Sequence, residues 1–350
     1  MIKGFFKIGL QAFLILIITL ISLNYLTNSP FKQLHEQNAD SILDEEYKIS
    51  KLISKNSKLV FNKEESYATV VSMYFPLNKS KHNLAEYEIW NRNALLSIEC
   101  PLILFTTSEM KKEYLKLRRH NVIFYIYENH WELFKEVEKN RNMSYIDSYM
   151  NKQFDIDPDQ KYHVKDLYVI WNSKAYIMDK MARLNPFNSS FFFYSDLGSW
   201  RWYVIPNWPD MNFVKIVNKH LKGRILFGQT AQVDNETAVE ILGDFIEGTF
   251  YAGSPQSIIS YAKLFYDVHD KRFKEGLFVG KDQTIMNYIA YKTEPKNYVR
   301  LRTLEMHVCN ENQTDKNNYY DLWFFYQQYF SSTNFFKCNY EKKLSILTNI

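Results

Sequence analysis

Short apolar runs rich in β-branched and aromatic residues alternate with helix-like segments from residue 67 onward. Three runs have the length and composition of buried strands: YATVVSMYFPL (67–77), PLILFTT (101–107) and NVIFYIY (121–127). Helices are predicted between them at 84–98 and 108–119, the second capped by Ser108. This βαβαβ order predicts an α/β fold with a doubly wound, mostly parallel sheet, which binds ligands at the carboxyl ends of its strands.

The second half continues the pattern. A long helix is predicted at 164–184, where Asn185-Pro186 ends it. The aromatic strand SFFFY (190–194) follows and leads directly into Asp196. Further predicted elements are strands at 223–230 and 248–254, a helix at 255–270, and a helix beginning near Asp282. Asp196 is therefore expected at the ligand-binding edge of the sheet.

An uncharged apolar run of 19 residues occupies positions 8–26. As a helix it would span roughly 28 Å, the thickness of a bilayer core. Lys3 and Lys7 precede it and acidic residues follow, so residues 1–7 are assigned to the cytoplasm. A cleaved signal peptide is the alternative, but no small-x-small site follows the run cleanly. We predict a single-pass type II membrane protein of the Golgi or endoplasmic reticulum, held in the membrane by this helix, with a lumenal domain.

The segment at 27–65 is polar and charged, and is predicted to be a stem: a solvated spacer, or a short self-associating helix. The folded domain is predicted at 66–350. Five N-glycosylation sequons lie downstream of the apolar run and fit a lumenal domain, at Asn78, Asn142, Asn188, Asn235 and Asn312.

Charge and cysteine content exclude several classes of protein. The 43 basic and 39 acidic residues are interspersed, without the basic block that nucleic-acid binding requires. Three cysteines are too few for a disulfide scaffold, and no CxxC pair suggests a zinc site. In an oxidising compartment Cys309 and Cys338 could form one bridge, while Cys100, beside an apolar run, is expected to be a buried free thiol.

Common catalytic signatures are also missing from the sequence. There is no GxGxxG, and GLFVGKD (276–282) does not fit a phosphate-binding loop. No HExxH, zinc-deaminase or GxSxG pattern is present. The remaining chemistry lies in carboxylates next to predicted strand and helix ends. Transfer from a nucleotide sugar uses such a carboxylate to hold a divalent cation or the ribose while charge develops on the leaving diphosphate.

Several segments and the Tyr87–Trp90 pair carry a family resemblance: TVVSMYF (69–75), PLILFTT (101–107), LYVIWNSKAYIMDKMARLNPF (167–187), FFFYSDLGSWR (191–201), FGQT (227–230), GTFYAGS (248–254) and GKDQTIMNYI (280–289). Together they resemble the HtrL/YibB family of glycosyltransferases, which includes the WlaTC-like proteins. The resemblance spans residues 67–291. Its most specific part is the run from Trp171 to Phe187 followed by Asp196-x-Gly198-x-x-Arg201.

The resemblance implies a single GT-A-like domain that takes its sugar from a nucleotide-sugar donor. Many GT-A enzymes carry an Asp-x-Asp motif. Gly198 stands here at the second position, so a requirement for Mn²⁺ or Mg²⁺ stays open. Asp196 is the candidate ligand of the cation or the donor. His307, near the end of the chain, is a candidate metal ligand. The alternative is a histidine buried in the core with its hydrogen bonds made there.

Four further residues are candidates for the site. Lys174 and Arg201 could contact diphosphate oxygens, although a lysine on a long helix is commonly solvated. Gly253 could permit close approach of the donor, or it could be an ordinary glycine in a turn. Asp282 is the candidate catalytic base for the acceptor hydroxyl, with helix capping as the alternative. Three tryptophans could stack on a sugar or base, or pack in the core: Trp171, Trp200 and Trp202.

The predicted function is transfer of a sugar from a nucleotide-sugar donor to a hydroxyl of a glycan or protein. One alternative is a membrane-tethered carbohydrate-binding module without catalysis. Another is a lumenal glycoside hydrolase with Asp196 and Asp282 as its carboxylate pair, roughly 5 to 9.5 Å apart.

Overall fold

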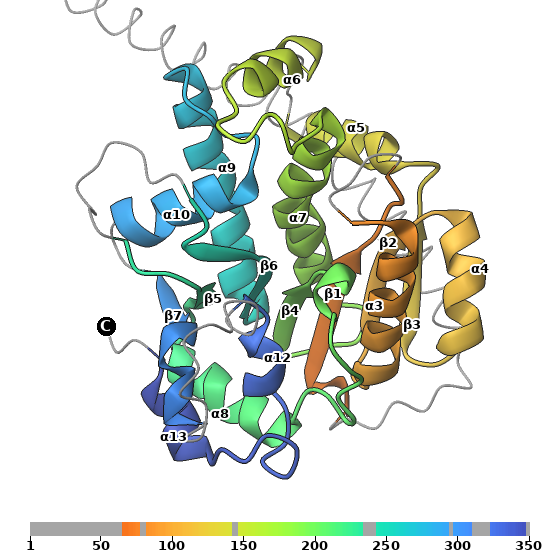
Figure 1. Cartoon of the computed structure of the whole chain (residues 1–350), viewed down its shortest axis with the longest axis vertical. Coiled ribbons are helices and arrows are strands. Elements are labelled where there is room, and N and C mark those ends of the chain that lie inside the picture. The colour runs from red at the N-terminus through yellow and green to blue at the C-terminus, as the bar shows by residue number, and fades with distance from the viewer. Residues whose placement is uncertain are drawn as a thin grey trace, which may run out of the picture. The chain divides into compact units, whose positions relative to one another are not determined.

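One mixed sheet of seven strands forms the centre of the described residues in the computed structural model (Figure 1). The structure describes residues 65–77, 82–141, 146–233, 243–293, 297–309 and 323–347. The strand order is β3-β2-β1-β4-β6-β5-β7. The strands are β1 (Ala68–Met73), β2 (Leu102–Thr106), β3 (Val122–Ile126), β4 (Phe191–Ser195), β5 (Ile225–Gln229), β6 (Ile246–Gly253) and β7 (Tyr298–Arg302).

The predicted α/β fold with a mostly parallel sheet is confirmed, and the sheet is Rossmann-like. β1 pairs in parallel with β2 and β4, β2 with β3, and β5 with β7. β6 alone among these strands is reversed, antiparallel to both β4 and β5. An antiparallel neighbour needs no crossover helix, so β6 can follow β5 by a return connection. The reversal brings the first residues of β6 to the edge where the other strands have their carboxyl ends.

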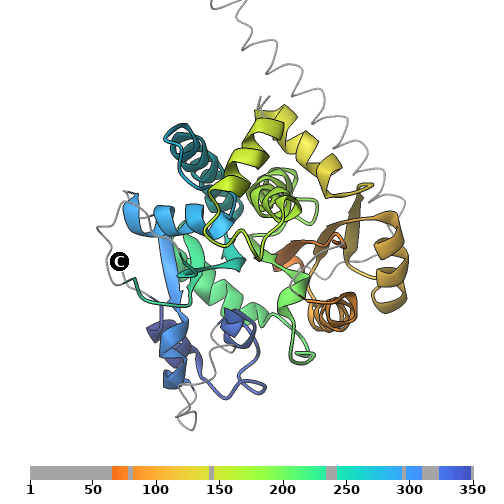
Figure 2. The same cartoon turned by 45° about the horizontal axis from the view of Figure 1, so that its top comes forward.

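Helices cover both faces of the sheet, as the turned view shows (Figure 2). One core packs α5 (His130–Arg141), α6 (Ile146–Asp155), α7 (Lys165–Leu184), α9 (Pro255–Lys274) and α10 (Asp282–Lys292) on one face. The other packs α3 (Leu84–Ser97), α4 (Ser108–Leu117), α8 (Met211–Leu221), α12 (Phe325–Tyr329) and α13 (Tyr340–Ser345) on the other. Three short 3₁₀ helices complete the description: η1 (Glu65–Tyr67), η2 (Leu197–Ser199) and η3 (Thr303–Val308).

Local capping explains where several of these helices begin and end. α3 begins with a capping box, in which Asn83 and Glu86 each bond the backbone N–H of the other. α4 is capped by Thr107, whose hydroxyl accepts from Met110 N, so the prediction of Ser108 as the cap was wrong by one residue. α7 ends at Asn185, which adopts the left-handed conformation with φ 38° directly before a proline.

Several segments contain helices or strands that the sequence analysis did not predict. The stretch between β3 and α7 contains α5 and α6, and its acidic part is not simply a surface loop. Asp157 is buried there and accepts hydrogen bonds from Tyr168 and His163. Helix α8, strand β7 and the C-terminal helices α12 and α13 were also missed. The sequence of α8 does carry a helical period, since Phe213, Val214, Val217 and Leu221 are its buried residues.

Several predictions fall outside the described residues: the cytoplasmic tail (1–7), the apolar helix (8–26), the stem up to residue 64, and the sequons at Asn78, Asn142, Asn235 and Asn312. Within the described part of the chain, no helix is both long enough and apolar enough to span a bilayer. Asn188 is described; it is exposed, in the left-handed conformation with φ 51°, in the turn before β4. The described residues all belong to one compact unit, Phe61–Ile350.

Both cysteine predictions are confirmed. Cys309 and Cys338 form a disulfide with their Cα atoms 5.0 Å apart, and Cys100 is a buried free thiol. The bridge joins the end of η3 to the segment between α12 and α13. It therefore ties the C-terminal helices to the edge of the sheet that carries β7.

A buried lysine in α13 predicts a pH-dependent stability. The Lys343 amine donates to Ser331 O at 2.7 Å, and burial, partly opposed by Asp210, lowers its pKa to about 8. A lysine in the unfolded chain has a pKa of about 10.4. Between these values the unfolded chain binds more protons, so the free energy of unfolding should rise as the pH increases, by about 2 kcal/mol over the window.

Urea unfolding at pH 7.5 and pH 10 would measure this rise in the wild-type chain. A Lys343→Met variant should lack the rise, because Met carries no proton to release. Other groups that titrate in the same window contribute equally to both proteins. Parallel pH profiles for the two proteins would contradict the prediction.

Candidate functional site

The candidate site lies at the carboxyl end of β4, where the reversed strand β6 begins. Asp196 directly follows β4, and its backbone N–H donates to Thr249 O of β6 at 3.0 Å. The register pairs Ser195 with Phe250, so residues 246–249 extend along the same edge. The predicted position of Asp196 at a strand's carboxyl end is therefore confirmed.

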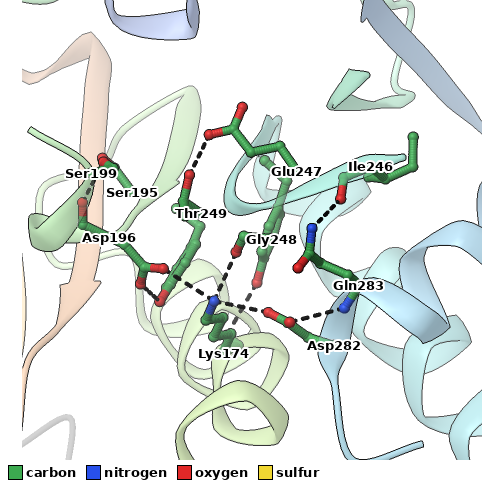
Figure 3. A network of polar contacts seen from close by, with 12 residues as sticks. Lys174, Ser195, Asp196, Ser199, Ile246, Glu247, Gly248, Thr249, Asp282 and Gln283 are labelled. Carbon is green, nitrogen blue, oxygen red and sulfur yellow. Dashed lines mark hydrogen bonds and ion pairs between the residues drawn. The ribbon is translucent and has the colours of Figure 1, made fainter. Parts of the chain in front are cut away.

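The centre of the site is the amine of Lys174, which lies between two carboxylates (Figure 3). Lys174 Nζ is 3.2 Å from Asp196 Oδ2 and 2.9 Å from Asp282 Oδ2. It also donates to Gly248 O at 2.8 Å. These groups come from α7, the end of β4, the first residue of α10 and β6, so the tertiary fold alone assembles them. We call Lys174, Asp196 and Asp282 the Lys174 triad.

Burial distinguishes the two carboxylates of the triad. Lys174 and Asp282 are 4% and 3% exposed, whereas the Asp196 side chain is 25% exposed. A lysine on a long helix is commonly solvated, and that alternative is wrong for Lys174. Asp196 is the member of the triad that a ligand can reach.

Electrostatics keep the amine charged in this buried position. Burial alone would lower the pKa of Lys174, but the charges of Asp196 and Asp282 more than offset this effect and raise its pKa. Burial raises the pKa of Asp282, while the Lys174 ammonium acts in the opposite direction. One ammonium thus faces two carboxylates, which leaves the triad with a net negative charge when all three groups are ionised.

Two stacked tyrosines hold the triad from one side. Tyr194 donates its hydroxyl hydrogen bond to Asp196 Oδ1, and the Lys174 amine lies 5.3 Å from the centre of the same ring. Tyr251 stacks on Tyr194 at 5.3 Å between centroids and donates to Lys174 O at 3.1 Å. Burial, together with Asp196, raises the pKa of Tyr194, which keeps its hydroxyl a donor. Both oxygens of Asp196 are therefore held in place by protein donors.

A glycine permits the close packing of β6 against α10. A Cβ atom on Gly248 would lie 2.8 Å from Gln283 Cγ and 3.1 Å from Asp282 Oδ1. A larger residue here would therefore press first on the Gln283 side chain and then on the Asp282 carboxylate. The sequence analysis had selected Gly253 instead. Gly253 lies at the opposite end of β6, paired with Phe192, and its missing Cβ leaves room for Ser257 Oγ.

A second buried acid, Glu247, was missed by the sequence analysis. It is fully buried in β6 and accepts a hydrogen bond from the Thr249 hydroxyl (Figure 3). Among the described residues, its Oε2 atom has no hydrogen-bond partner. Burial raises the pKa of Glu247 well above its usual range, which favours the neutral acid. The sequence signal was an acid in an otherwise apolar strand.

Asp282 is almost completely buried and pairs with Lys174, so its position suits it to hold that lysine better than to contact an acceptor. One of its oxygens accepts from Gln283 N at 2.9 Å and the other pairs with Lys174. The cap residue Lys281 makes no side-chain capping bond, and the Asp282 carboxylate satisfies one backbone N–H in the first turn of α10, that of Gln283. Since a general base must reach the acceptor hydroxyl, a catalytic role for Asp282 remains a prediction that would require this buried group to become accessible.

Arg201 and His307 are not part of the triad. The Arg201 guanidinium lies 4.5 Å from the centre of the Trp90 ring and 4.9 Å from that of Phe324, in the segment that follows η2. His307 is exposed in η3, so the alternative of a core histidine is wrong. η3 follows β7, and β6 and β5 separate β7 from β4 in the sheet.

The described residues do not supply a preformed cation site. Within them, no group of three or more His, Cys, Asp or Glu side chains converges in a way that could hold a metal ion. A Mg²⁺ ion that arrives bound to phosphates needs only one or two protein carboxylates. Asp196 is the triad member whose exposure fits that use.

A groove of about 470 Å³ lies at the same edge of the sheet, over the ends of the first three strands. Phe75 follows β1, Thr107 follows β2 and Glu128 follows β3 in its lining. His130 Nε2 lies 2.6 Å from Asp166 Oδ1 at its wall. A second groove of about 550 Å³, between α3 and α4, shares Pro76 and Met110 with the first. Both volumes are those of small-molecule sites, and the sequence predicted neither.

In comparisons with known proteins, no family model matches this chain, and no curated protein matches it.

Proposed function

We propose that this chain is a glycosyltransferase with a GT-A-like domain, which moves a sugar from a nucleotide-sugar donor to a hydroxyl of a glycan or protein. The observation that carries the proposal is the partly exposed Asp196 at the carboxyl end of β4, held by Lys174 and Tyr194. A ligand-sized groove lies over the ends of β1, β2 and β3 at the same edge of the sheet. In open α/β sheets, ligands bind outside the carboxyl ends of the strands. The resemblance to the HtrL/YibB family, carried by FFFYSDLGSWR and the other segments quoted above, supports the same assignment.

The nucleoside of the donor would bind in the groove, and its diphosphate would bind near the triad. The groove over β1, β2 and β3 has room for a nucleoside, and β4, which carries Asp196, is the next strand beside β1. A diphosphate between them would lie near Asp196, and a divalent cation held by this carboxylate would supply Lewis-acid charge. Lys174 contributes a fixed positive charge that orients Asp196. Tyr194 holds the second oxygen of that carboxylate.

The glycoside hydrolase alternative fits the site less well. Asp196 and Asp282 pair with the same ammonium, so the oxygens that contact it are at most roughly 6 Å apart, which overlaps only the short end of the range of hydrolase carboxylate pairs. The Lys174 amine, however, occupies the space between them. The sugar would have to lie there, and Asp282 is almost completely buried.

The disulfide supports the proposed compartment. A bridge between Cys309 and Cys338 forms and persists in oxidising compartments. This agrees with a lumenal domain of the Golgi or endoplasmic reticulum, tethered through the apolar run at 8–26. The acceptor would then be a glycan or glycoprotein of the same compartment.

A nucleotide-sugar screen tests the proposal. The melting temperature of the purified full-length chain is measured with UDP-, GDP- and CMP-sugars, each with and without Mn²⁺ or Mg²⁺. At least one donor should raise the melting temperature, since a ligand that binds only the folded state stabilises it. Absence of any donor-dependent rise would reject the proposal. It would leave the non-catalytic carbohydrate-binding module as the alternative.

A further inference from the structure

We propose that Tyr326 is a positioning residue, which holds Asp196 in the geometry that donor binding requires. Tyr326 lies in the C-terminal helix α12, 131 positions after Ser195 in the chain. It is fully buried, so it acts through Asp196 and does not itself contact the donor. The inference rests on the proposed function, because it names a further residue on which the donor site depends.

The Tyr326 hydroxyl joins the two serines on either side of Asp196. It lies 2.8 Å from Ser195 Oγ and 2.7 Å from Ser199 Oγ. The Ser199 hydroxyl donates to Asp196 O at 2.6 Å (Figure 3). At the other end, the indole N–H of Trp200 donates to Ser195 Oγ at 3.2 Å. We call Trp200, Ser195, Tyr326 and Ser199 the hydroxyl network.

Only one direction of donation satisfies every hydroxyl in this network. A backbone carbonyl can only accept, so the single Ser199 proton is used for Asp196 O. Tyr326 must therefore donate to Ser199, and its own oxygen accepts from Ser195. Burial raises the pKa of Tyr326, which keeps the phenol protonated for this bond. Removing the Tyr326 hydroxyl would take the acceptor from Ser195 and a donor from Ser199.

The network holds Asp196 from the face of the sheet opposite to Lys174. Lys174 and Tyr194 bond the two carboxylate oxygens of Asp196 on the face that α7 covers. Tyr326 belongs to the other core, where its ring stacks on Phe250 with centroids 4.3 Å apart. From there the network fixes the backbone carbonyl of Asp196. A binding carboxylate has to be held within about 0.5 Å, so its backbone must be fixed as well as its side chain.

Local hydrogen exchange tests this positioning without any ligand. Tyr326→Phe removes only the hydroxyl: a Phe ring keeps the stacking on Phe250, and Gln327 Nε2 still donates to Ser199 O at 3.0 Å. In the full-length chain, the amides of residues 195–201 should exchange about tenfold faster than in the wild type, because their bonds open locally. The amides of β1 and β2 should keep their rates. Mass spectrometry of peptides from these segments measures both.

Donor affinity tests the consequence for the site. The probe is whichever UDP-, GDP- or CMP-sugar raises the melting temperature of the wild type. Tyr326→Phe should raise the Kd of this sugar about tenfold, because a displaced carboxylate loses its alignment with the donor. Calorimetric titration well below the melting temperature of every variant measures the Kd of the folded protein, which a loss of stability alone leaves unchanged.

A second variant and a matched control identify the hydroxyl network as the cause. Ser199→Ala removes the bond to Asp196 O directly and should reproduce both effects. The double variant should be no weaker than either single variant, since all three lack the same connection. Tyr329→Phe is the control: Tyr329 is also fully buried on α12, but its hydroxyl has no hydrogen-bond partner among the described residues. It should exchange and bind the donor as the wild type does.

Three results would overturn the inference: wild-type exchange at residues 195–201 in Tyr326→Phe and Ser199→Ala, a wild-type Kd in both variants, or an equal change in Tyr329→Phe. The failure of the proposed function would look different. If the wild type binds none of the sugars while exchange at 195–201 still responds to Tyr326→Phe, the transferase is rejected, and Tyr326 remains the residue that fixes the Asp196 turn.

Discussion

Lys174→Met should destabilise the folded domain by about 3–5 kcal/mol, because it removes the shared partner of two carboxylates and leaves Asp282 buried without a counter-charge. Met keeps approximately the length of the lysine chain, so lost packing contributes little. Without Lys174, burial should raise the pKa of Asp282 further. The folded state would then bind more protons than the unfolded chain, and the stability of the variant should fall as the pH rises. Urea unfolding at pH 5 and pH 8 measures both effects.

Two further variants test the cause of this loss. Lys180→Met is the matched control on the same helix: Lys180 is also largely buried, but its partner Glu136 keeps hydrogen bonds from Tyr127 and Tyr176. Lys180→Met should lower the free energy of unfolding by about 1 kcal/mol. Adding Asp282→Asn to Lys174→Met should recover part of the stability and remove the pH dependence, since Asn is neutral. If the double variant is as pH-dependent as Lys174→Met, the buried charge of Asp282 is not the cause.

Asp196→Asn should abolish the donor-dependent rise in melting temperature and lower transfer at least about 10²-fold, because Asn lacks the negative charge with which the carboxylate would hold a cation or a ribose hydroxyl. The unliganded protein should lose only about 1 kcal/mol or less, since the Asp196 side chain is partly exposed and Asp282 still pairs with Lys174. Thermal unfolding with and without the donor, followed by an assay of transfer, measures both expectations.

The matched control for Asp196 is Asp179→Asn. Asp179 has the same side-chain exposure of 25% and is also ion-paired, to Arg183 on α7. The Asp179→Asn variant should bind the donor as the wild type does. Normal donor binding by Asp196→Asn would remove Asp196 from the proposed site. A large fall in the stability of its unliganded form would instead assign the carboxylate a structural role.

The sequence by itself determined the fold class and the main positions of its strands. Runs such as FFFY at 191–194 can only be buried, and their alternation with helices leaves few arrangements other than a sheet covered on both faces. Asp196 could be located because it directly follows such a run. The disulfide partners were also predictable, since three cysteines allow few pairings.

Only the tertiary structure decided which groups meet Asp196. Lys174 lies 22 positions away on a helix and Asp282 lies at the start of another, and no local pattern states that their side chains converge. Their convergence depends on the reversal of β6 and on Gly248, whose missing Cβ lets α10 approach. The period of apolar residues in a sequence indicates which face of each helix or strand is buried. Distances between side chains of different elements depend instead on packing across the whole sheet. For this reason Gly253 was selected where Gly248 is used, and Glu247 was not foreseen.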